Sequence, residues 1–525
     1  MLSYLVLLAV STMACILAGV GAGALVKHRS GTIFDRGLIG YAVLAAIALF
    51  LHFWLPGWIC GGCVLAFAAF ASCLAWQHQI AFLRAQPLSD AIIGFALLIG
   101  IWWHATKSAL NYDMGLYYIQ ASKWTSFQPL LPGLANLHER FGFDSLIHSL
   151  GGLTLTPLVG VASIDVGFHA IVWLCLGRLL SELFRVRVFS RAWLAGVPFL
   201  GACALRPSFL NIGAPTPDFA SAAIGVLMIF YFLKDAEGEQ DAALLCLIAA
   251  VLGAVVRIQL FAFLGLILIL WRRRKPRPLC VVPLLLLAIW FLRNIGLSGC
   301  IVYPIAVTCL TVPWAAGANV AASSATNIRH WATTHMSLPS GSADVALIFG
   351  CLLSAAVAFK SRSFWRPCFW PVVFGSVYAI AIFAGAPDFR FVLAIVLISI
   401  SAFAAGCLGS VAGARPAVAR WMGVGLLALA FGTELRSGLP NSQWPRIPTP
   451  STHLVSTAVG VINEPTVGDQ CWDAPLPCSP GVQGVGTAWL QREFVQRHIL
   501  PKIAPGKAVV SGAVAIERNG FRTGQ

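Results

Sequence analysis

Charged residues are scarce in this chain of 525 residues. Asp, Glu, Lys and Arg together make up 10% of the sequence, whereas hydrophobic residues make up 58% and the mean hydropathy is +0.81. A soluble globular domain carries roughly a quarter charged residues. A transmembrane β-barrel is excluded as well, because its strands alternate in polarity and do not stay apolar for twenty residues. The sequence therefore predicts an all-α polytopic membrane protein.

Several catalytic motifs are also absent from the sequence. It contains no Walker A pattern, no GxGxxG that opens a helix after a strand, and no zinc-ligand spacing. The chain therefore supplies no energy from ATP hydrolysis, and we expect no cofactor and no resident metal site, with a divalent cation left open. It also lacks an internal repeat, a feature often found in transporters.

The net charge of +15 does not indicate a nucleic-acid partner. The basic residues form short clusters between apolar runs, as membrane topology requires, and no basic face with interleaved aromatic residues is present. We therefore expect no nucleic-acid binding.

The apolar runs predict about fourteen transmembrane helices, with twelve as the lower bound. Each run is long enough to cross, or nearly cross, a hydrocarbon core of roughly 30 Å. The predicted spans are 2–25, 37–56, 59–76, 91–106, 163–183, 192–205, 218–233, 241–256, 258–271, 278–293, 344–359, 368–386, 391–413 and 421–435. Small residues such as those in GVGAGA, from Gly19, are interpreted as helix-packing contacts rather than ligand loops.

The distribution of positive charge predicts the orientation. The first run has no positive charge before it and is too long for the apolar part of a signal peptide, so we expect a span with its N-terminus outside. The short segments predicted to be cytoplasmic hold 18 Lys and Arg residues, whereas the short outer segments hold 8. This excess is what the positive-inside rule requires.

This map divides the chain into a transmembrane domain, residues 1–435, and an extracytoplasmic C-terminal tail, residues 436–525. The domain carries two long extracytoplasmic loops, 107–162 and 294–343. The tail is rich in Pro, Gly and Ser, shows little helical periodicity, and contains GDQCWDAPLPCSP. Cys471 and Cys478 are predicted to form a disulfide on the oxidising side of the membrane. Two free thiols are the alternative, and a metal site is disfavoured because no other ligand lies nearby.

A polar segment, NYDMGLYYIQASKWTSFQPLLPGLANLHERFGF at residues 111–143, follows the fourth predicted span. Its Asp113 would lie at the membrane surface beside tyrosine and tryptophan rings. Partial desolvation raises the basicity of a carboxylate and suits a general base. Asp113 could instead cap the N-terminus of an amphipathic helix. The sequence leaves both interpretations open.

Other polar residues on the same predicted face could bind substrate. Arg favours phosphate oxygens, which it contacts through paired hydrogen bonds, and ionisable residues near the bilayer are functional candidates. Each has a structural alternative: a polar turn, snorkelling to the interface, or, for Asp388 and Arg390, pairing with each other. Asp165 and Asp218 are interpreted as helix caps. The candidate substrate-binding residues are Lys123, Asn136, His138, Arg140, Arg257, Arg293, Asp388 and Arg390.

The sequence also resembles a known family. YDMGLYYIQASKW, PGLANLHERFGFDS, RNIGLSGCIVYP, APDFRF and GDQCWDAPLPC look like the signature blocks of largely uncharacterised bacterial multi-spanning proteins of cell-surface polysaccharide loci. More distantly, the layout is similar to the GT-C glycosyltransferases. Those enzymes take sugars from polyprenyl-phosphate donors at the outer face of the membrane, and they carry an acidic catalytic residue in their first large outer loop.

The resemblance implies a GT-C-like fold and a glycosyltransferase of the bacterial cytoplasmic (inner) membrane. Asp113 would be its catalytic residue. Its partners would be a polyprenyl-phosphate-linked sugar, a surface-glycan or lipid-linked acceptor, membrane lipid and other polysaccharide-assembly proteins. A polymerase of O-antigen or capsule repeats is the first alternative. A non-enzymatic flippase or transporter of lipid-linked glycan is the second.

Overall fold

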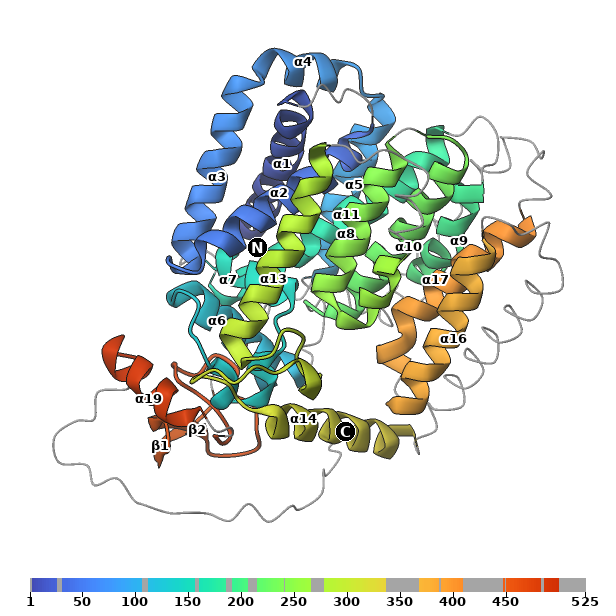
Figure 1. Cartoon of the computed structure of the whole chain (residues 1–525). Coiled ribbons are helices and arrows are strands. Elements are labelled where there is room, and N and C mark those ends of the chain that lie inside the picture. The colour runs from blue at the N-terminus through green and yellow to red at the C-terminus, as the bar shows by residue number, and fades with distance from the viewer. Residues whose placement is uncertain are drawn as a thin grey trace.

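The computed structural model describes most of the chain and shows a bundle of long helices with a smaller, mixed region at one end (Figure 1). The described residues are 2–25, 31–105, 112–155, 160–185, 191–205, 215–239, 241–265, 278–336, 368–386, 389–408, 447–448, 450–482 and 486–499.

The elements of the described chain are mainly α-helices. The longer helices are α1 (Leu2–Leu25), α2 (Ile33–Leu51), α3 (Gly57–Leu74), α4 (Trp76–Arg84), α5 (Leu88–Ala105), α6 (Ile119–Phe127), α7 (Leu146–Thr154), α8 (Val166–Arg185), α9 (Arg191–Leu205), α10 (Pro217–Ala236), α11 (Ala242–Val256), α13 (Val281–Ser298), α14 (Ala318–Met336), α16 (Phe369–Gly385), α17 (Phe389–Leu408) and α19 (Thr487–Gln496). Short 3₁₀ helices are η2 (Leu134–Asn136), η3 (Glu139–Gly142), η4 (Val161–Asp165), η6 (Ile258–Leu264), η7 (Pro278–Cys280) and η8 (Ala306–Thr308), and η1 (Met114–Tyr118) is a π-helix. Strands β1 (Thr452–Thr457) and β2 (Gly460–Pro465) form an antiparallel hairpin that pairs Val455 with Ile462.

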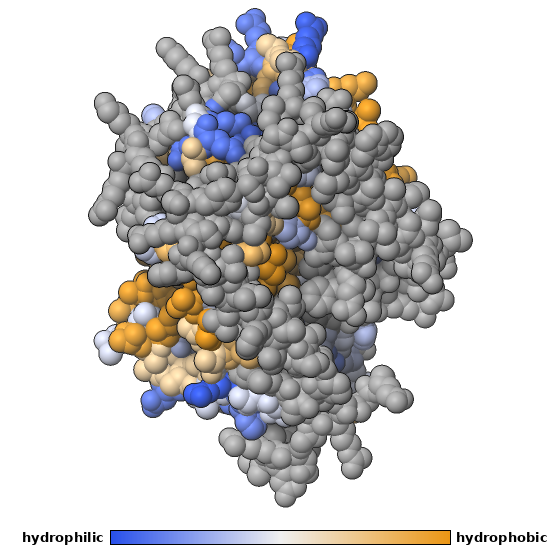
Figure 2. Space-filling view, turned by 90° about the vertical axis from the view of Figure 1, so that its right-hand side faces the viewer, coloured by the Kyte–Doolittle hydropathy of each residue, from blue (hydrophilic) through white to orange (hydrophobic). Residues whose placement is uncertain are grey.

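Seven helices in the described residues are long and apolar enough to cross a membrane. They are Leu2–Ala24, Ile33–Leu51, Gly57–Leu74, Leu88–Ala105, Ser163–Glu182, Pro217–Ala236 and Pro278–Ser298. Three shorter apolar helices accompany them, Ala242–Val256, Phe369–Gly385 and Phe391–Gly406. Apolar side chains reach the visible surface as a patch bordered by polar side chains (Figure 2). The chain is therefore a largely helical, multi-pass membrane protein.

The contact between α1 and α2 depends on glycine. A Cβ added to Gly19 would lie 1.7 Å from the carbonyl oxygen of Arg36, and one added to Gly40 would lie 1.8 Å from that of Cys15. The two backbones touch at these positions, so no larger residue fits. This confirms that the glycine of the GVGAGA stretch is a packing residue of the kind found between membrane helices.

The structure differs from the predicted span map in several places. Residues 258–264 form the 3₁₀ helix η6 instead of the start of a spanning α-helix. Helix α9 has only 15 residues and contains Pro198, which cannot donate a backbone hydrogen bond inside the helix. The predicted spans 344–359 and 421–435 lie outside the described residues. The boundary errors arise because apolar composition alone does not show where a helix ends.

The smaller region combines segments that are far apart in the sequence. Met114, Trp124 and Leu137 from the first polar segment share one apolar core with Ile462 and Phe494 from the C-terminal part. Trp124 and Phe494 stack with ring centroids 5.6 Å apart. The tail shows little helical periodicity in its sequence, and in the structure it contributes the β1–β2 hairpin and the short helix α19 to this core. A search for runs of hydrophobic residues misses these short elements.

Candidate functional site

A cavity of about 820 Å³ lies where the smaller region meets the helix bundle. Its lining includes polar and charged residues, among them Asp113, Glu139, Arg140 and Asp218. It also includes apolar residues, with Val255 and Val256 of α11, Ile328 of α14, Ile382 of α16 and Phe391 of α17. A volume of this size suits a small-molecule substrate or the head of a lipid. The cavity can therefore take a ligand with one polar and one apolar part.

Asp113 lines this cavity from the first turn of a helix that continues through η1 and α6. Its backbone is already helical, with φ −64° and ψ −22°, and its side chain makes no capping hydrogen bond. An N-cap residue normally has an extended backbone and accepts such a bond. The geometry therefore does not match the alternative in which Asp113 is a helix cap. The π-helix that follows, Met114–Tyr118, is a rare element that often occurs at functional sites.

The pKa of Tyr117 depends on the charged residues around the cavity. Burial raises the pKa of Tyr117 to about 12, the negative charge of Asp113 adds to this, and Arg140 and Arg257 act against it. The charges of three candidate residues, Asp113, Arg140 and Arg257, therefore all affect the pKa of this one phenol. A carboxylate and two guanidinium groups therefore line the same cavity as this phenol.

Arg140 is the more available of the two arginines that line the cavity. Its guanidinium lies 6.0 Å from the ring centroid of Tyr117 and 5.9 Å from that of Phe143, a distance at which cation–π attraction operates. Within the described chain it forms no ion pair with a carboxylate. His138, from the same segment, is a buried neighbour that accepts a hydrogen bond from the Arg140 backbone N–H at 3.0 Å. Arg140 therefore keeps its charge for an anion in the cavity.

Arg257 differs from Arg140 because it is already paired. It ends α11, and its guanidinium contacts a carboxylate oxygen of Asp218 at 2.6 Å and lies 5.4 Å from the Phe391 ring centroid. Asp218, expected from the sequence to be only a cap, joins α10 to α11 in this way. An anion that binds here competes with Asp218, so Arg257 is the weaker candidate for a phosphate contact.

Arg293 lies beside the cavity, in a buried network, and does not line it. Its Nε donates to Asp144 Oδ2 at 2.9 Å, and its Nη2 donates to Asp144 Oδ1 at 3.1 Å and to Ser149 Oγ at 2.9 Å. Its Nη1 lies 2.8 Å from Nδ1 of His52. Burial and the charge of Arg293 lower the pKa of His52 to about 3, so this histidine is neutral and accepts the hydrogen bond. Arg293 is therefore paired with Asp144 and does not belong to the lining of the large cavity.

Two other candidates, Lys123 and Asn136, hold the C-terminal region in place. Lys123 Nζ lies 3.0 Å from the Asp473 carboxylate and donates to the Ala474 carbonyl at 2.7 Å. Asn136 accepts a hydrogen bond from the Gly486 backbone N–H at 2.8 Å and donates to the Trp314 carbonyl at 2.9 Å. Both side chains are buried in these contacts, and neither lines the large cavity.

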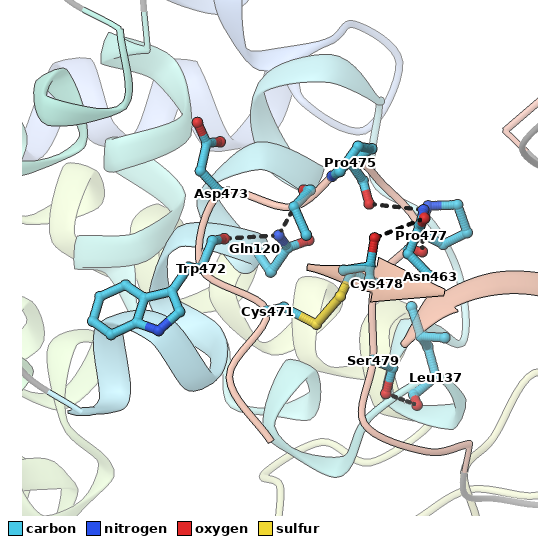
Figure 3. The surroundings of a disulfide bond; sticks show 12 residues. Gln120, Leu137, Asn463, Cys471, Trp472, Asp473, Pro475, Pro477, Cys478 and Ser479 are labelled. Carbon is cyan, nitrogen blue, oxygen red and sulfur yellow. Dashed lines mark hydrogen bonds between the residues drawn. A yellow bond between two sulfur atoms is a disulfide. The ribbon is translucent and has the colours of Figure 1, made fainter. Parts of the chain in front are cut away.

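The predicted disulfide between Cys471 and Cys478 is present and shapes the loop that rests on α6 (Figure 3). The side-chain amide of Gln120 donates to the carbonyls of Trp472 and Ala474 at 2.9 and 3.0 Å. Just before this loop, Asp469 lines the cavity and accepts a hydrogen bond from the Tyr112 hydroxyl. The C-terminal region therefore supplies part of the cavity wall. A second disulfide, Cys300–Cys309, which the sequence analysis did not identify, closes a loop after α13.

Gly115 allows the loop that carries Trp472 to pack closely against the π-helix η1. A Cβ added there would lie 2.3 Å from the Trp472 indole, and the Trp472 N–H donates to the Gly115 carbonyl at 2.9 Å. We expect Gly115→Ala to displace the indole and make residues 450–482 more susceptible to protease, by roughly tenfold in cleavage rate. Gly62→Ala is the matched control, because nothing lies within 4 Å of that site. Limited proteolysis of the purified full chain measures both, and equal cleavage of the two variants would contradict this packing role.

The remaining candidates fall outside what the structure describes. Asp388 lies outside the described residues, and the side chain of Arg390 is not among those described. Some cavity residues were not predicted from the sequence. Glu139 lies between the predicted residues His138 and Arg140, and Asp144 directly follows the same segment. Nothing in the sequence around Asp469 indicates that it lines the cavity, because the fold of the tail brings it there. No group of three potential metal ligands occurs in the described part of the chain.

The fold and the cavity define the protein as a multi-pass helical membrane protein with a candidate ligand site at one end of the bundle. Residues 1–340 match the family described as Domain of unknown function (DUF8201). The match covers more than half of the 525 residues, so the chain belongs to this family. No curated protein and no solved structure matches it.

Proposed function

We propose that the protein is a GT-C-like glycosyltransferase that moves a sugar from a polyprenyl-phosphate donor to a glycan or lipid-linked acceptor. The observation that carries the proposal is the cavity that Asp113 and Arg140 share, which is lined by both polar and apolar side chains. A lipid-linked sugar phosphate likewise has a polar head and an apolar chain.

In the proposed reaction, the Asp113 carboxylate takes the proton from an acceptor hydroxyl. The acceptor oxygen attacks the anomeric carbon and forms the new glycosidic bond. The bond between that carbon and the phosphate oxygen breaks, and its electron pair leaves with the polyprenyl phosphate. The guanidinium of Arg140 stabilises the negative charge of the leaving phosphate. A single direct displacement inverts the anomeric configuration.

We place the lipid chain of the donor beside apolar residues of the cavity lining. Val256 and Ile382 belong to apolar helices that pack in the bundle, and both line the cavity. An isoprenoid chain that leaves the cavity on this side enters an apolar environment, which avoids the cost of exposing it to water.

The two disulfides support an extracytoplasmic site, because disulfides persist in oxidising compartments. The loop closed by Cys300–Cys309 contains the cavity residue Tyr303, and Cys471–Cys478 follows the cavity residue Asp469 by two residues. The excess of positive charge in the opposite loops supports the same orientation. We therefore propose that transfer occurs at the outer face of the cytoplasmic membrane.

Deletion of the gene tests the proposal. Lipid-linked and surface glycans from the deletion strain and from a strain complemented with the wild-type chain are compared by mass spectrometry. We expect the glycan of the deletion strain to lack one sugar residue and the lipid-linked precursor of that sugar to accumulate. In the complemented strain, we expect the sugar to return to the glycan and the accumulated precursor to disappear.

Other results would favour the alternative functions. Glycans that collapse to single repeats of normal composition would indicate a polymerase. Complete lipid-linked glycan that is protected from externally added glycosidase in intact spheroplasts would indicate a flippase. Unchanged glycans would refute a role in glycan assembly.

A further inference from the structure

Two buried side chains of the cavity wall have polar atoms without a protein partner. His148 on α7 is 5% exposed, and neither of its ring nitrogens has a hydrogen-bond partner in the described chain. Glu139 on η3 is 7% exposed, and its Oε2 likewise has none. Most buried polar atoms in proteins are hydrogen-bonded, so each exception needs an explanation. His148 and Glu139 line the same cavity, so the simplest explanation is that both bind the same ligand.

The chemistry of these atoms restricts the ligand. Burial and the positive charge of Arg257 lower the pKa of His148 to about 3, so its ring is neutral and offers one donor and one acceptor nitrogen. A carboxylate oxygen of Glu139 accepts hydrogen bonds and repels an anion. A fully ionised phosphate group cannot donate to Glu139, whereas a hydroxyl can both donate and accept.

The surroundings of these two residues are aromatic. The His148 ring lies 5.6 Å from the Tyr117 centroid in an edge-to-face arrangement, and Phe143 and Tyr303, 5.1 Å apart, also line the cavity. A sugar ring has apolar C–H faces and a rim of hydroxyls, so it fits a pocket that combines aromatic faces with unpaired acceptors. Arg140, which is next to Glu139 in the sequence, has the opposite chemistry and suits an anion.

We propose that His148 and Glu139 form the sugar-binding part of the cavity and hold hydroxyl groups of the transferred or accepting sugar, while Arg140 holds the phosphate. This inference rests on the proposed function, and it assigns to each residue the part of the substrate that it recognises. Both residues bind and position the sugar, and the proton transfer stays with Asp113.

Binding of two defined lipids to the purified full chain tests the assignment. The probes are undecaprenyl phosphate and a panel of undecaprenyl phosphates that each carry one hexose, with dissociation constants from native mass spectrometry. We expect the wild-type chain to bind at least one hexosyl lipid about tenfold more tightly than undecaprenyl phosphate. This corresponds to one or two net hydrogen bonds, at about 1.4 kcal/mol for each factor of ten.

The variants separate the sugar part from the phosphate part. His148→Phe keeps an aromatic ring beside Tyr117 and Tyr118 but removes both nitrogens, and Glu139→Met keeps the chain length but removes the acceptors. We expect both to bind undecaprenyl phosphate like the wild type and to lose the preference for the hexosyl lipid. We expect Arg140→Gln to weaken binding of both lipids. Tyr118→Phe is the matched control, because Tyr118 packs on His148 with ring centroids 4.2 Å apart but does not line the cavity.

The outcomes distinguish this inference from the proposed function. If His148→Phe and Glu139→Met keep the wild-type preference, the sugar site is wrong and the transferase proposal stands. If the wild-type chain binds the lipid phosphate but prefers no hexosyl lipid, the sugar site is also wrong. If it binds neither lipid, the proposed function fails and the sugar site fails with it.

Discussion

Asp113→Asn is expected to lower the rate of sugar transfer by a factor of about 10² to 10⁴, the usual contribution of a positioned general base. The amide has nearly the same shape as the carboxylate but cannot take the proton from the acceptor hydroxyl. We expect the fold to stay intact, because the substitution preserves the size and shape of the side chain. The rate is measured as incorporation of labelled sugar into glycan by membranes of the deletion strain that contain the variant.

Glu493→Gln provides the matched control for Asp113→Asn. It is the same change from carboxylate to amide, it lies on α19 outside the cavity, and it removes only an ion pair with Arg497. We expect this variant to transfer sugar at the wild-type rate. Asp113 is not the base if Asp113→Asn, at the same protein level, keeps more than half of the wild-type rate.

Asp144→Ala is expected to destabilise the protein by about 3–5 kcal/mol, the usual effect of removing one partner of a buried ion pair. The guanidinium of Arg293 is 1% exposed and lies at the end of a membrane-spanning helix, where it cannot regain water. Its neighbours, Ser149 and a neutral His52, do not balance its charge. Thermal unfolding of the detergent-solubilised chain measures the loss.

The double variant Asp144→Leu/Arg293→Met provides the control for this prediction. Replacing a whole buried ion pair by apolar residues of similar size is often neutral or stabilising, because no unpaired charge remains. We therefore expect the double variant to unfold closer to the wild type than Asp144→Ala does. Equal destabilisation of the two variants would mean that packing around these side chains matters more than their charges.

The helical class of the fold was predictable from the sequence, because a long apolar run in a chain with few charges has few other stable structures in a membrane. The ends of the helices were less predictable. Residues 258–264 are as apolar as a spanning helix but form η6, and composition alone does not distinguish the two.

The candidate site was only partly predictable for a related reason. Asp113, His138 and Arg140 were selected from one polar segment, and they do line one cavity with Arg257. Arg293 and Lys123 belong to the same residue types, but their carboxylate partners, Asp144 and Asp473, come from other parts of the chain. Local sequence shows which charges are present, whereas the tertiary fold decides which of them are already paired. The roles of Asp469 and His148 depend in the same way on contacts with distant segments.

The position of Asp469 has a consequence for biosynthesis. Ribosomes make a chain from its N-terminus, so α1 to α17 are synthesised before the loop that carries Asp469. The cavity lining is complete only when this loop, closed by its disulfide, has docked against Gln120. A chain in which α1 to α17 are in place but this loop has not yet been made therefore has an incomplete cavity.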